Sequence, residues 1–477
     1  MLFNSVEYAV FLPIVFLLYW FVFNRNVKGQ NLFVLVASYV FYAWWDWRFL
    51  GLIIITSLTT YVSGLIIDKN RETPQKAKLV SALNVVVNLL ILGVFKYYDF
   101  FVTSFANAFL GGKTDGLLLK LVLPVGISFY TFKALSYSID VYRGKMEPTR
   151  DIVQFFAFVS FFPQLLAGPI DRAMTLLPQF AKPRTFKYEE GVDGMRQILW
   201  GLFKKMVIAD NCAVYVDQIF SSYQTQSGST LLIAAILYTF QIYGDFSGYS
   251  DMAIGTGKLF GFRFMQNFKV PYFSRDIAEF WRRWHISLTS WFRDYIYIPM
   301  GGSRCSKGRI VLNTFVVFLV SGLWHGANWT FIAWGAYHAL LFLPLILLGK
   351  NRRFRDTVAE GRLFPNLKEL GQMLLTFFLA VVGWIIFRAD SIAQAWSYMQ
   401  GVIDKSLFTV PDAPGITGVS LGIAVMLVVE WLQRKREYAL DLATVKPSVF
   451  RYAIYLGVLF LTFAFGGHTE NFIYFQF

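Results

Sequence analysis

The chain contains only four histidines: His325 stands in an aromatic, otherwise apolar stretch, and His285 stands in an aromatic stretch that also carries Arg282 and Arg283. His325 lies in GLWHGANW and His285 in RRWHISL, so a tryptophan precedes each imidazole. Because burial disfavours the charged form of imidazole, we expect a histidine in such a setting to be neutral near physiological pH. A neutral imidazole can serve as a general base toward a hydroxyl that attacks an ester or thioester. The residues alone fit a hydrogen-bonded packing role for His325 equally well. His285 could hold the acceptor hydroxyl or polarise a carbonyl, and an interfacial side chain fits its surroundings about as well.

The immediate neighbours of His325 suggest how its surroundings are built. On a straight helix, Asn328 and Trp329 would share its face, and Gly322 would leave room beside the ring. Trp324 directly precedes it. The third histidine, His338, would lie about 220° around the same helix, so we expect it to be a packing residue. The fourth, His468, follows two glycines and is expected in a loop or at a helix end.

Charged and hydroxyl residues form two further candidate groups. Asp245 and Ser247 stand in YGDFSGYSD, where the acid could orient a histidine, pair with a basic residue or line a polar path. Asp251 lies six residues on and faces elsewhere on a straight helix, so the two acids are not expected to act as a dyad. Arg282 and Arg283 could bind the phosphates of a coenzyme A or phosphopantetheine donor, or extend to lipid phosphates. A cation-transport role for the acids stays open.

The composition is that of a polytopic, all-α membrane protein. Of the 477 residues, 56% are hydrophobic and 16% are charged, where a soluble domain has about 25% charged residues. The net charge of +14 is explained by basic cytoplasmic loops, and we do not expect nucleic-acid binding. Cys212 and Cys305 are too few for a disulfide framework or a cysteine metal cluster, and no metal site is expected.

Apolar runs predict about 11 membrane-spanning helices, with some runs short, re-entrant or interfacial. Residues 68–78, 350–362 and 433–437 are basic and are expected to face the cytoplasm. The first run should remain as a transmembrane helix rather than a cleaved signal peptide. The candidate runs are 6–23, 31–45, 49–67, 79–95, 98–110, 117–139, 151–168, 195–218, 229–244, 248–262, 309–322, 324–348, 371–388, 416–433 and 451–466.

Polar residues concentrate between about residues 124 and 340, which marks the expected catalytic core of a single transmembrane domain over 1–477. Gly168-Pro169 should interrupt a helix, and Pro124 with Gly126 should do the same, because proline removes a donor and restricts the preceding residue. Interrupted backbone at membrane depth is tolerated only against protein or a cavity.

Taken together, the motifs resemble those of the membrane-bound O-acyltransferase family. The resemblance is to its bacterial branch, which O-acetylates alginate and peptidoglycan or transfers D-alanine to teichoic acid. The sequence departs from the expected pattern at Lys133 and Gly244, away from the histidines. The motifs are SYVFYAWWDWRFL (38–50), LPVGISFYTFKALSYSIDVYRG (123–144), FFPQLLAGPIDR (161–172), QIYGDFSGYSDMAIG (241–255), EFWRRWHISLTSWFRDYIYIPMGG (279–302), GLWHGANWTFIAWGAYHAL (322–340) and FIYFQF (472–477).

The resemblance implies a ring of helices around a thinned central tunnel, with His325 as the catalytic residue and His285 lining the tunnel. It further implies O-acetylation of an extracytoplasmic polysaccharide, with alginate-like material favoured over peptidoglycan acetylation or D-alanyl transfer. Acetyl-CoA is the expected donor substrate, and no bound cofactor is expected. A periplasmic or extracellular acetyltransferase partner and a bacterial inner-membrane location are also implied. The rival class is a channel or transporter for polysaccharide or acyl groups without covalent chemistry.

Overall fold

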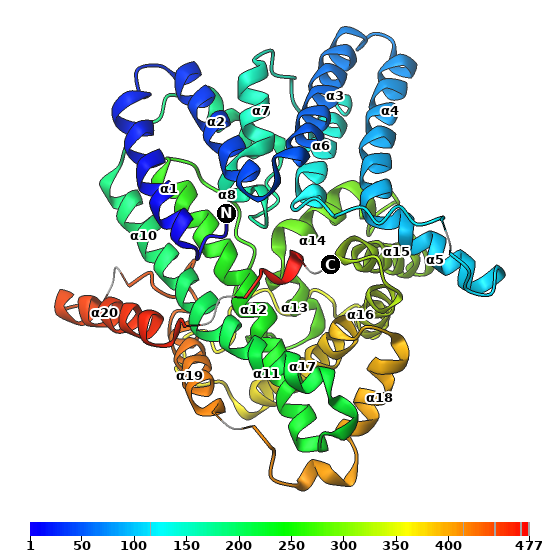
Figure 1. Ribbon diagram of the computed structural model, residues 1–477, viewed down its shortest axis with the longest axis vertical. Helices are drawn as coiled ribbons and strands as arrows, with labels where there is room; N and C mark the ends of the chain where they lie inside the picture. Colours follow the sequence, from blue (N-terminus) through cyan, green and yellow to red (C-terminus); the bar gives the residue numbers. More distant parts are fainter. Residues whose placement is uncertain (115, 414, 443–444, 468–469, 476–477) are drawn as a thin grey trace. The chain divides into compact units, whose positions relative to one another are not determined.

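The computed structural model describes residues 1–477 except 115, 414, 443–444, 468–469 and 476–477 (Figure 1). His468 and the end of the FIYFQF motif therefore lie outside the described residues. The described residues form helices and loops and contain no β-strand, so the predicted all-α class is confirmed. They divide into two compact units, 1–195 with 253–265, and 196–252 with 266–477. Two of the three unit boundaries fall inside helices, α10 (Tyr188–Leu202) and α12 (Gly228–Leu259), and the third falls in the loop after Met265.

Unit 1 is built around helices α2 and α3. Helix α2 begins at a capping side chain, and α3 begins directly after a short turn at residues 47–49. Asn26 caps α2 by accepting a hydrogen bond from the Gly29 N–H. Helix α2 packs on α7, and α3 packs on α4 and α6 (Figure 1). The helices of this unit are α1 (Val6–Leu17), α2 (Val27–Asp46), α3 (Leu50–Lys69), α4 (Pro74–Leu92), α5 (Tyr98–Phe109), α6 (Ile127–Tyr142), α7 (Ile152–Ser160), α8 (Phe162–Leu165) and α9 (Ala173–Ala181).

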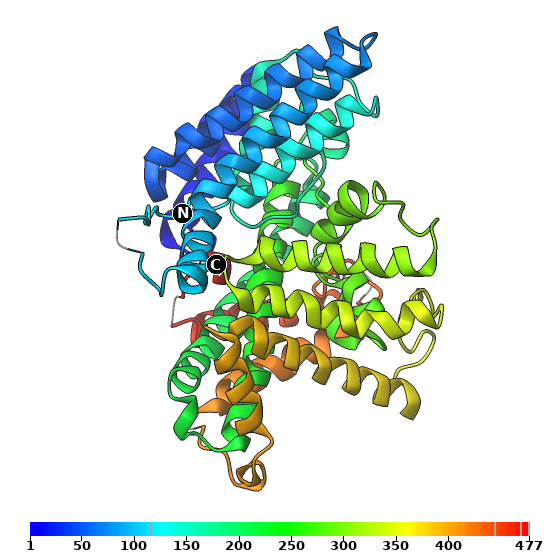
Figure 2. The ribbon, with the colours of Figure 1, turned by 90° about the vertical axis from the view of Figure 1, so that its right-hand side faces the viewer.

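Unit 2 carries both histidines of interest. Figure 2 shows three of its helices, α15, α16 and α17, running side by side, and each packs against the next. Two short helices, α13 and α14, meet at a sharp turn after Trp284. The helices are α11 (Asp210–Ser221), α13 (Ile277–Arg283), α14 (Ile286–Phe292), α15 (Lys307–His325), α16 (Trp329–Leu347), α17 (Leu367–Arg388), α18 (Ile392–Val402), α19 (Ile416–Leu432) and α20 (Ser448–Phe465), with most of α12.

Seven helical stretches of the described chain are long and apolar enough to cross a membrane, and two shorter apolar helices accompany them. This confirms a polytopic membrane protein. The longest stretch, Val27–Lys69, joins α2 and α3 through a single turn, and each of these helices has 20 residues. The other long stretches are Pro74–Phe109, Gly228–Leu259, Lys307–His325, Trp329–Leu347, Leu367–Arg388 and Ser448–Phe465, and the shorter ones are Val6–Val22 and Ile416–Leu432.

The structure corrects several predicted helix boundaries. The runs 229–244 and 248–262 form the single helix α12, because the glycines of GDFSG pack closely against neighbouring backbone instead of breaking the helix. A Cβ on Gly248 would stand 2.7 Å from the Gly201 carbonyl oxygen. The predicted interruptions are present: α6 begins only after Gly126, whose φ is 77°, and backbone without helical structure follows α8 at Gly168-Pro169.

Two of the three basic loops lie against each other in unit 2. The guanidinium of Arg434 donates hydrogen bonds to the carbonyl oxygens of Val358, Ala359 and Arg362. The loops 350–362 and 433–437 are therefore at the same end of this unit, as their predicted common orientation requires.

Candidate active site

His325 is the last residue of α15, and the helix ends there because the chain turns back at Gly326. Helix α16 starts at Trp329, so the predicted continuous helix through His338 is wrong. The hairpin is tight because glycines replace side chains at its crossing points. A Cβ on Gly322 would stand 2.2 Å from the Phe331 carbonyl oxygen, which only a glycine avoids. Gly322 thus makes room for α16 and not for the imidazole, which corrects the prediction.

This break also corrects the predicted roles of Asn328 and Trp329. Asn328 is the N-cap of α16, accepts a hydrogen bond from the Thr330 N–H and donates to the Asp390 carbonyl oxygen. Trp329 opens α16 with 52% of its surface exposed. Neither residue shares a helix face with His325, because no helix runs through 326–328. Trp324, by contrast, lies beside the imidazole, with ring centroids 5.0 Å apart.

His285 lies in the turn between α13 and α14 and is only 1% exposed. Its backbone has φ 42° and ψ 54°, the left-handed region that non-glycine residues seldom occupy. Buried Asn267 holds this turn: its carbonyl oxygen accepts from the Ile286 N–H, and its side-chain oxygen accepts from the Ser287 hydroxyl. Such backbone strain persists where the surroundings over-determine it, commonly at functional sites.

The structure brings the two histidines together from these separate elements. Their ring centroids are 6.3 Å apart, and His325 is 4% exposed. Among the described residues, neither ring nitrogen of His285 has a hydrogen-bond partner. Burial lowers the pKa of His285 to about 3, so its imidazole is neutral at physiological pH. A neutral imidazole can donate one hydrogen bond and accept another, and no described protein group uses either capacity of His285.

Aromatic rings enclose the pair, and sequence reasoning missed most of them. Phe246 contacts the His285 ring edge-on at 4.5 Å, and Tyr474 lies 5.7 Å from the His325 ring and 6.5 Å from that of His285. Trp334 and Phe387 pack on the other sides of His325, at 5.1 and 5.4 Å. Tyr474 could have been suspected from the closing FIYFQF motif, and Phe246 from its place between Asp245 and Ser247 in YGDFSGYSD.

Asp245 does not contact the histidines but anchors the segment that brings Tyr474 to them. One carboxylate oxygen lies 2.8 Å from the Lys205 ammonium, and the other accepts a hydrogen bond from the Ile473 N–H. Lys205 also pairs with Asp210 at 2.6 Å and donates to the Glu470 carbonyl oxygen. This buried ion group therefore fixes residues 470–474, here named the C-terminal segment, beside the histidine pair. The pattern could not reveal Lys205, since its partners are distant in sequence.

The remaining predicted residues have separate places. Ser247 is buried on α12, and its hydroxyl has no hydrogen-bond partner among the described residues. Asp251 pairs with Lys204 at 2.6 Å and not with Asp245, as expected from their spacing. His338 is packed between Trp281 and Trp334 and accepts a hydrogen bond from the Trp281 indole N–H at 3.4 Å, which fits the predicted packing role.

Arg282 and Arg283 lie at a basic cavity of about 630 Å³ that extends to Ile286, the residue after His285. Six basic side chains and one acidic one line this cavity, together with aromatic rings such as Trp281 and Phe318. Arg282 donates to the carbonyl oxygens of Asn351 and Phe354, and Arg283 pairs with Glu279. The two predicted arginines are thus engaged by protein groups, although the cavity that they line is suited to an anionic ligand.

Comparisons with known proteins point to one family. The membrane-bound O-acyltransferase family matches residues 39–376. The chain is 41% identical over 450 residues to the probable alginate O-acetylase AlgI of Pseudomonas aeruginosa, a match that covers 93% of this chain and 84% of that protein. It is 35% identical over 450 residues to the peptidoglycan O-acetyltransferase of Helicobacter pylori, covering 88% and 81%. The teichoic acid D-alanyltransferase of Bacillus subtilis is 30% identical over 279 residues, covering 56% and 69%.

Proposed function

Because this chain belongs to the membrane-bound O-acyltransferase family, and is therefore an O-acyltransferase, we propose that it transfers an acetyl group from a cytoplasmic thioester donor, acetyl-CoA, to an acceptor hydroxyl. The observation that carries this proposal is the pair of buried histidines, His285 and His325, held 6.3 Å apart inside aromatic walls. The product would serve the O-acetylation of an extracytoplasmic polysaccharide.

In the proposed reaction, His325 acts as the general base. Its neutral imidazole takes the proton of the acceptor hydroxyl while the hydroxyl oxygen forms a bond to the thioester carbonyl carbon. The carbon–sulfur bond then breaks, and the imidazolium returns the proton to the departing thiolate. Atoms and charges balance, and the products are an acetyl ester and free CoA. The rings of Trp334 and Phe387 pack against this imidazole, with centroids 5.1 and 5.4 Å away, and hold it in place.

His285 is proposed to position the reacting groups. A neutral imidazole offers one N–H donor and one acceptor nitrogen, and neither nitrogen of His285 is taken by a described protein group. The N–H can donate to the thioester carbonyl oxygen, on which negative charge develops in the transition state. The constrained turn at φ 42° fixes the direction of this donor before the substrate binds.

The basic cavity supports a phosphate-bearing donor. It borders α14 at Ile286, directly after His285, and its lining combines arginine and lysine with apolar rings. The phosphate groups of the donor can bind to the arginine and lysine side chains, and its pantetheine arm can lie along the apolar rings. The loop 350–362, expected to face the cytoplasm, forms part of the lining, which agrees with a cytoplasmic donor.

The polymer is proposed from the relatives. Probable alginate O-acetylases from Pseudomonas aeruginosa and Azotobacter vinelandii are 41% and 42% identical to this chain, so an alginate-like exopolysaccharide is the first candidate. Peptidoglycan acetylation is the second, and D-alanyl transfer to teichoic acid the third. A periplasmic or extracellular acetyltransferase partner would pass the acetyl group to sugar hydroxyls, and the bacterial inner membrane would be the location.

The test follows release of free CoA from acetyl-CoA in inside-out membrane vesicles, which retain any partner, against vesicles without this chain. We expect release by the wild type and at least about a hundredfold loss in His325→Ala. His338→Gln is the matched control, because His338 is equally buried but packs between Trp281 and Trp334. Wild-type release that persists in a folded His325→Ala variant would sink the catalytic role, and polymer or acyl transport without CoA release would favour the transporter class.

A further inference from the structure

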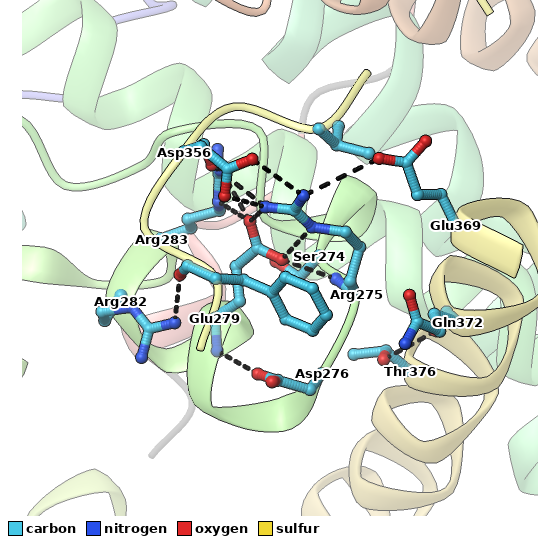
Figure 3. Close-up of polar contacts among 12 residues, drawn as sticks. Ser274, Arg275, Asp276, Glu279, Arg282, Arg283, Asp356, Glu369, Gln372 and Thr376 are labelled. Atoms are coloured by element: carbon cyan, nitrogen blue, oxygen red, sulfur yellow. Dashed lines mark hydrogen bonds and ion pairs between the residues drawn. The ribbon is translucent and has the colours of Figure 1, made fainter. Parts of the chain in front are cut away.

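A group of buried charges lies at the basic cavity without touching the histidines. Glu279 is 1% exposed and Arg275 5%, and Figure 3 shows how they converge with Arg283 and Asp356. The Glu279 carboxylate accepts hydrogen bonds from the Arg275 backbone N–H and from both guanidinium groups. Arg275 also pairs with Asp356 at 2.9 Å and approaches Glu369 at 3.8 Å.

Helix α13 gives these side chains their spacing. Glu279 and Arg283 lie four residues apart on this helix, and Arg275 stands just before the N-cap Asp276, so both guanidinium groups reach the one Glu279 carboxylate. Asp276 starts the helix by accepting a hydrogen bond from the Glu279 N–H at 2.7 Å. Arg282, one position before Arg283, extends to a different set of atoms.

The arginines hold the loop of residues 351–357 by its backbone. Arg282 donates to the carbonyl oxygens of Asn351 and Phe354, while Arg275 and Arg283 both donate to that of Asp356. The Arg275 guanidinium also lies 4.3 Å from the centre of the Phe354 ring. Several charge-assisted contacts therefore set the course of a loop that has no regular secondary structure.

This loop is one wall of the basic cavity. Asn351, Arg352, Phe354, Arg355 and Thr357 all line it. Among the described residues, neither Arg355 nor Lys269, which lines the cavity from outside the loop, takes part in an ion pair. Arg282 and Arg352 also lack a carboxylate partner, but Arg282 donates to backbone carbonyl oxygens and Arg352 to the Ser303 hydroxyl. Arg355 and Lys269 are thus the two lining cations whose side chains have no described hydrogen bond or ion pair, and the position of Arg355 depends on the loop.

We infer that Arg275 and Glu279 are positioning residues that hold the loop 351–357 so that Arg355 and Lys269 bind the phosphate groups of a nucleotide-bearing thioester donor. Arg282 and Arg283 fix the loop instead of contacting the donor. This inference rests on the proposed function, since it concerns the donor of that reaction. A buried ion pair contributes little net stability compared with apolar packing, so a role in placing the loop accounts for its cost better than stability does.

The test compares two donors, acetyl-CoA and S-acetylpantetheine, which lacks all phosphate groups. Arg275→Lys preserves the charge but loses the forked contacts to Glu279 and Asp356. Asp356→Asn removes the ion pair from its exposed side and leaves no buried charge unpaired, so it serves if Arg275→Lys does not fold. In both variants we expect the KM for acetyl-CoA to rise about tenfold or more with little change in kcat. The KM for S-acetylpantetheine should stay at the wild-type value.

Asp217→Asn is the matched control. Asp217 pairs with Arg388 at 2.7 Å, and its side chain is 50% exposed, against 51% for that of Asp356. Neither Asp217 nor Arg388 lines the cavity. A second readout is trypsin cleavage after Arg352, Arg353 or Arg355, which should be faster in Asp356→Asn and unchanged in Asp217→Asn.

The outcomes separate the two proposals. The positioning role would be overturned by an equal rise in KM for both donors or by an unchanged KM for acetyl-CoA. It would also be overturned by a lower KM for acetyl-CoA, which is the result expected if the only effect were removal of a negative charge near an anion. Absence of CoA release by the wild type would instead count against the proposed function. Turnover of acetyl-CoA by the wild type with a donor-selective rise in KM in the variants supports both.

Discussion

The histidine pair and the arginine group of α13 are both buried and polar, yet they treat their polar atoms in opposite ways. Both ring nitrogens of His285 lack a described protein partner, whereas the Glu279 carboxylate and the Arg275 guanidinium make several contacts each. Leaving a buried polar group unpaired costs about 1–3 kcal/mol, so it persists where a ligand completes it. In these two regions, the imidazole without a described partner lies where we propose chemistry, and the fully paired charges lie where we propose a positioning role.

The sharpest way to break this comparison is a double variant of the histidines. We expect His325→Gln and His285→Asn each to lower CoA release about 10²- to 10⁴-fold, because base and donor act in one transition state. Asparagine is chosen at 285 since it tolerates the left-handed backbone. Groups that act as a unit are non-additive, so the double variant should be no slower than the slower single one. If the loss of CoA release in the double variant equals the product of the two single losses, the two rings act independently.

Removal of the Glu279 carboxylate should lower the stability of the protein, whereas removal of a histidine should lower its activity. Glu279→Gln leaves Arg275 and Arg283 without their shared buried carboxylate, and breaking such a group costs about 3–5 kcal/mol. We expect a large fall in melting temperature in detergent, measured by intrinsic tryptophan fluorescence. His285→Asn, measured alongside, should change the melting temperature little. A Glu279→Gln protein as stable as the wild type would remove the distinction between the two regions.

Tyr474 tests which side of the comparison the C-terminal segment belongs to. If its hydroxyl contacts reacting groups beside the histidines, Tyr474→Phe should lower CoA release about ten- to a hundredfold, as loss of one strong hydrogen bond does. Tyr474→Leu, which also removes the ring packed on His325, should be at least as slow. Full activity in Tyr474→Phe with loss in Tyr474→Leu would assign the residue to packing.

The sequence predicted the helical class and the proximity of His285 and His325 better than it predicted the residues that position them. Composition and apolar runs were sufficient for a polytopic helical protein, since those signals are summed over many residues. The boundary at Gly326 was missed because Asn328 and Trp329 also fit a continuous helix, and only the close approach of Phe331 to Gly322 requires a hairpin. Lys205 and Asn267 were missed because their contacts join segments far apart in the chain. Arg275 and Glu279 were readable from their four-residue spacing.

The smallest expected effect is the acid sensitivity that a neutral buried histidine confers. The pKa of His285 is lowered by burial to about 3, below its ordinary value of 6.5. Between these values the unfolded chain binds a proton that the folded one excludes, so stability is full above pH 6.5 and falls by about 1.4 kcal/mol per pH unit down to pH 3. When the pH is lowered from 7.5 to 5.5, the melting temperature should therefore fall less in His285→Asn than in the wild type. An equal fall in melting temperature in both proteins would mean that His285 is protonated in the folded state.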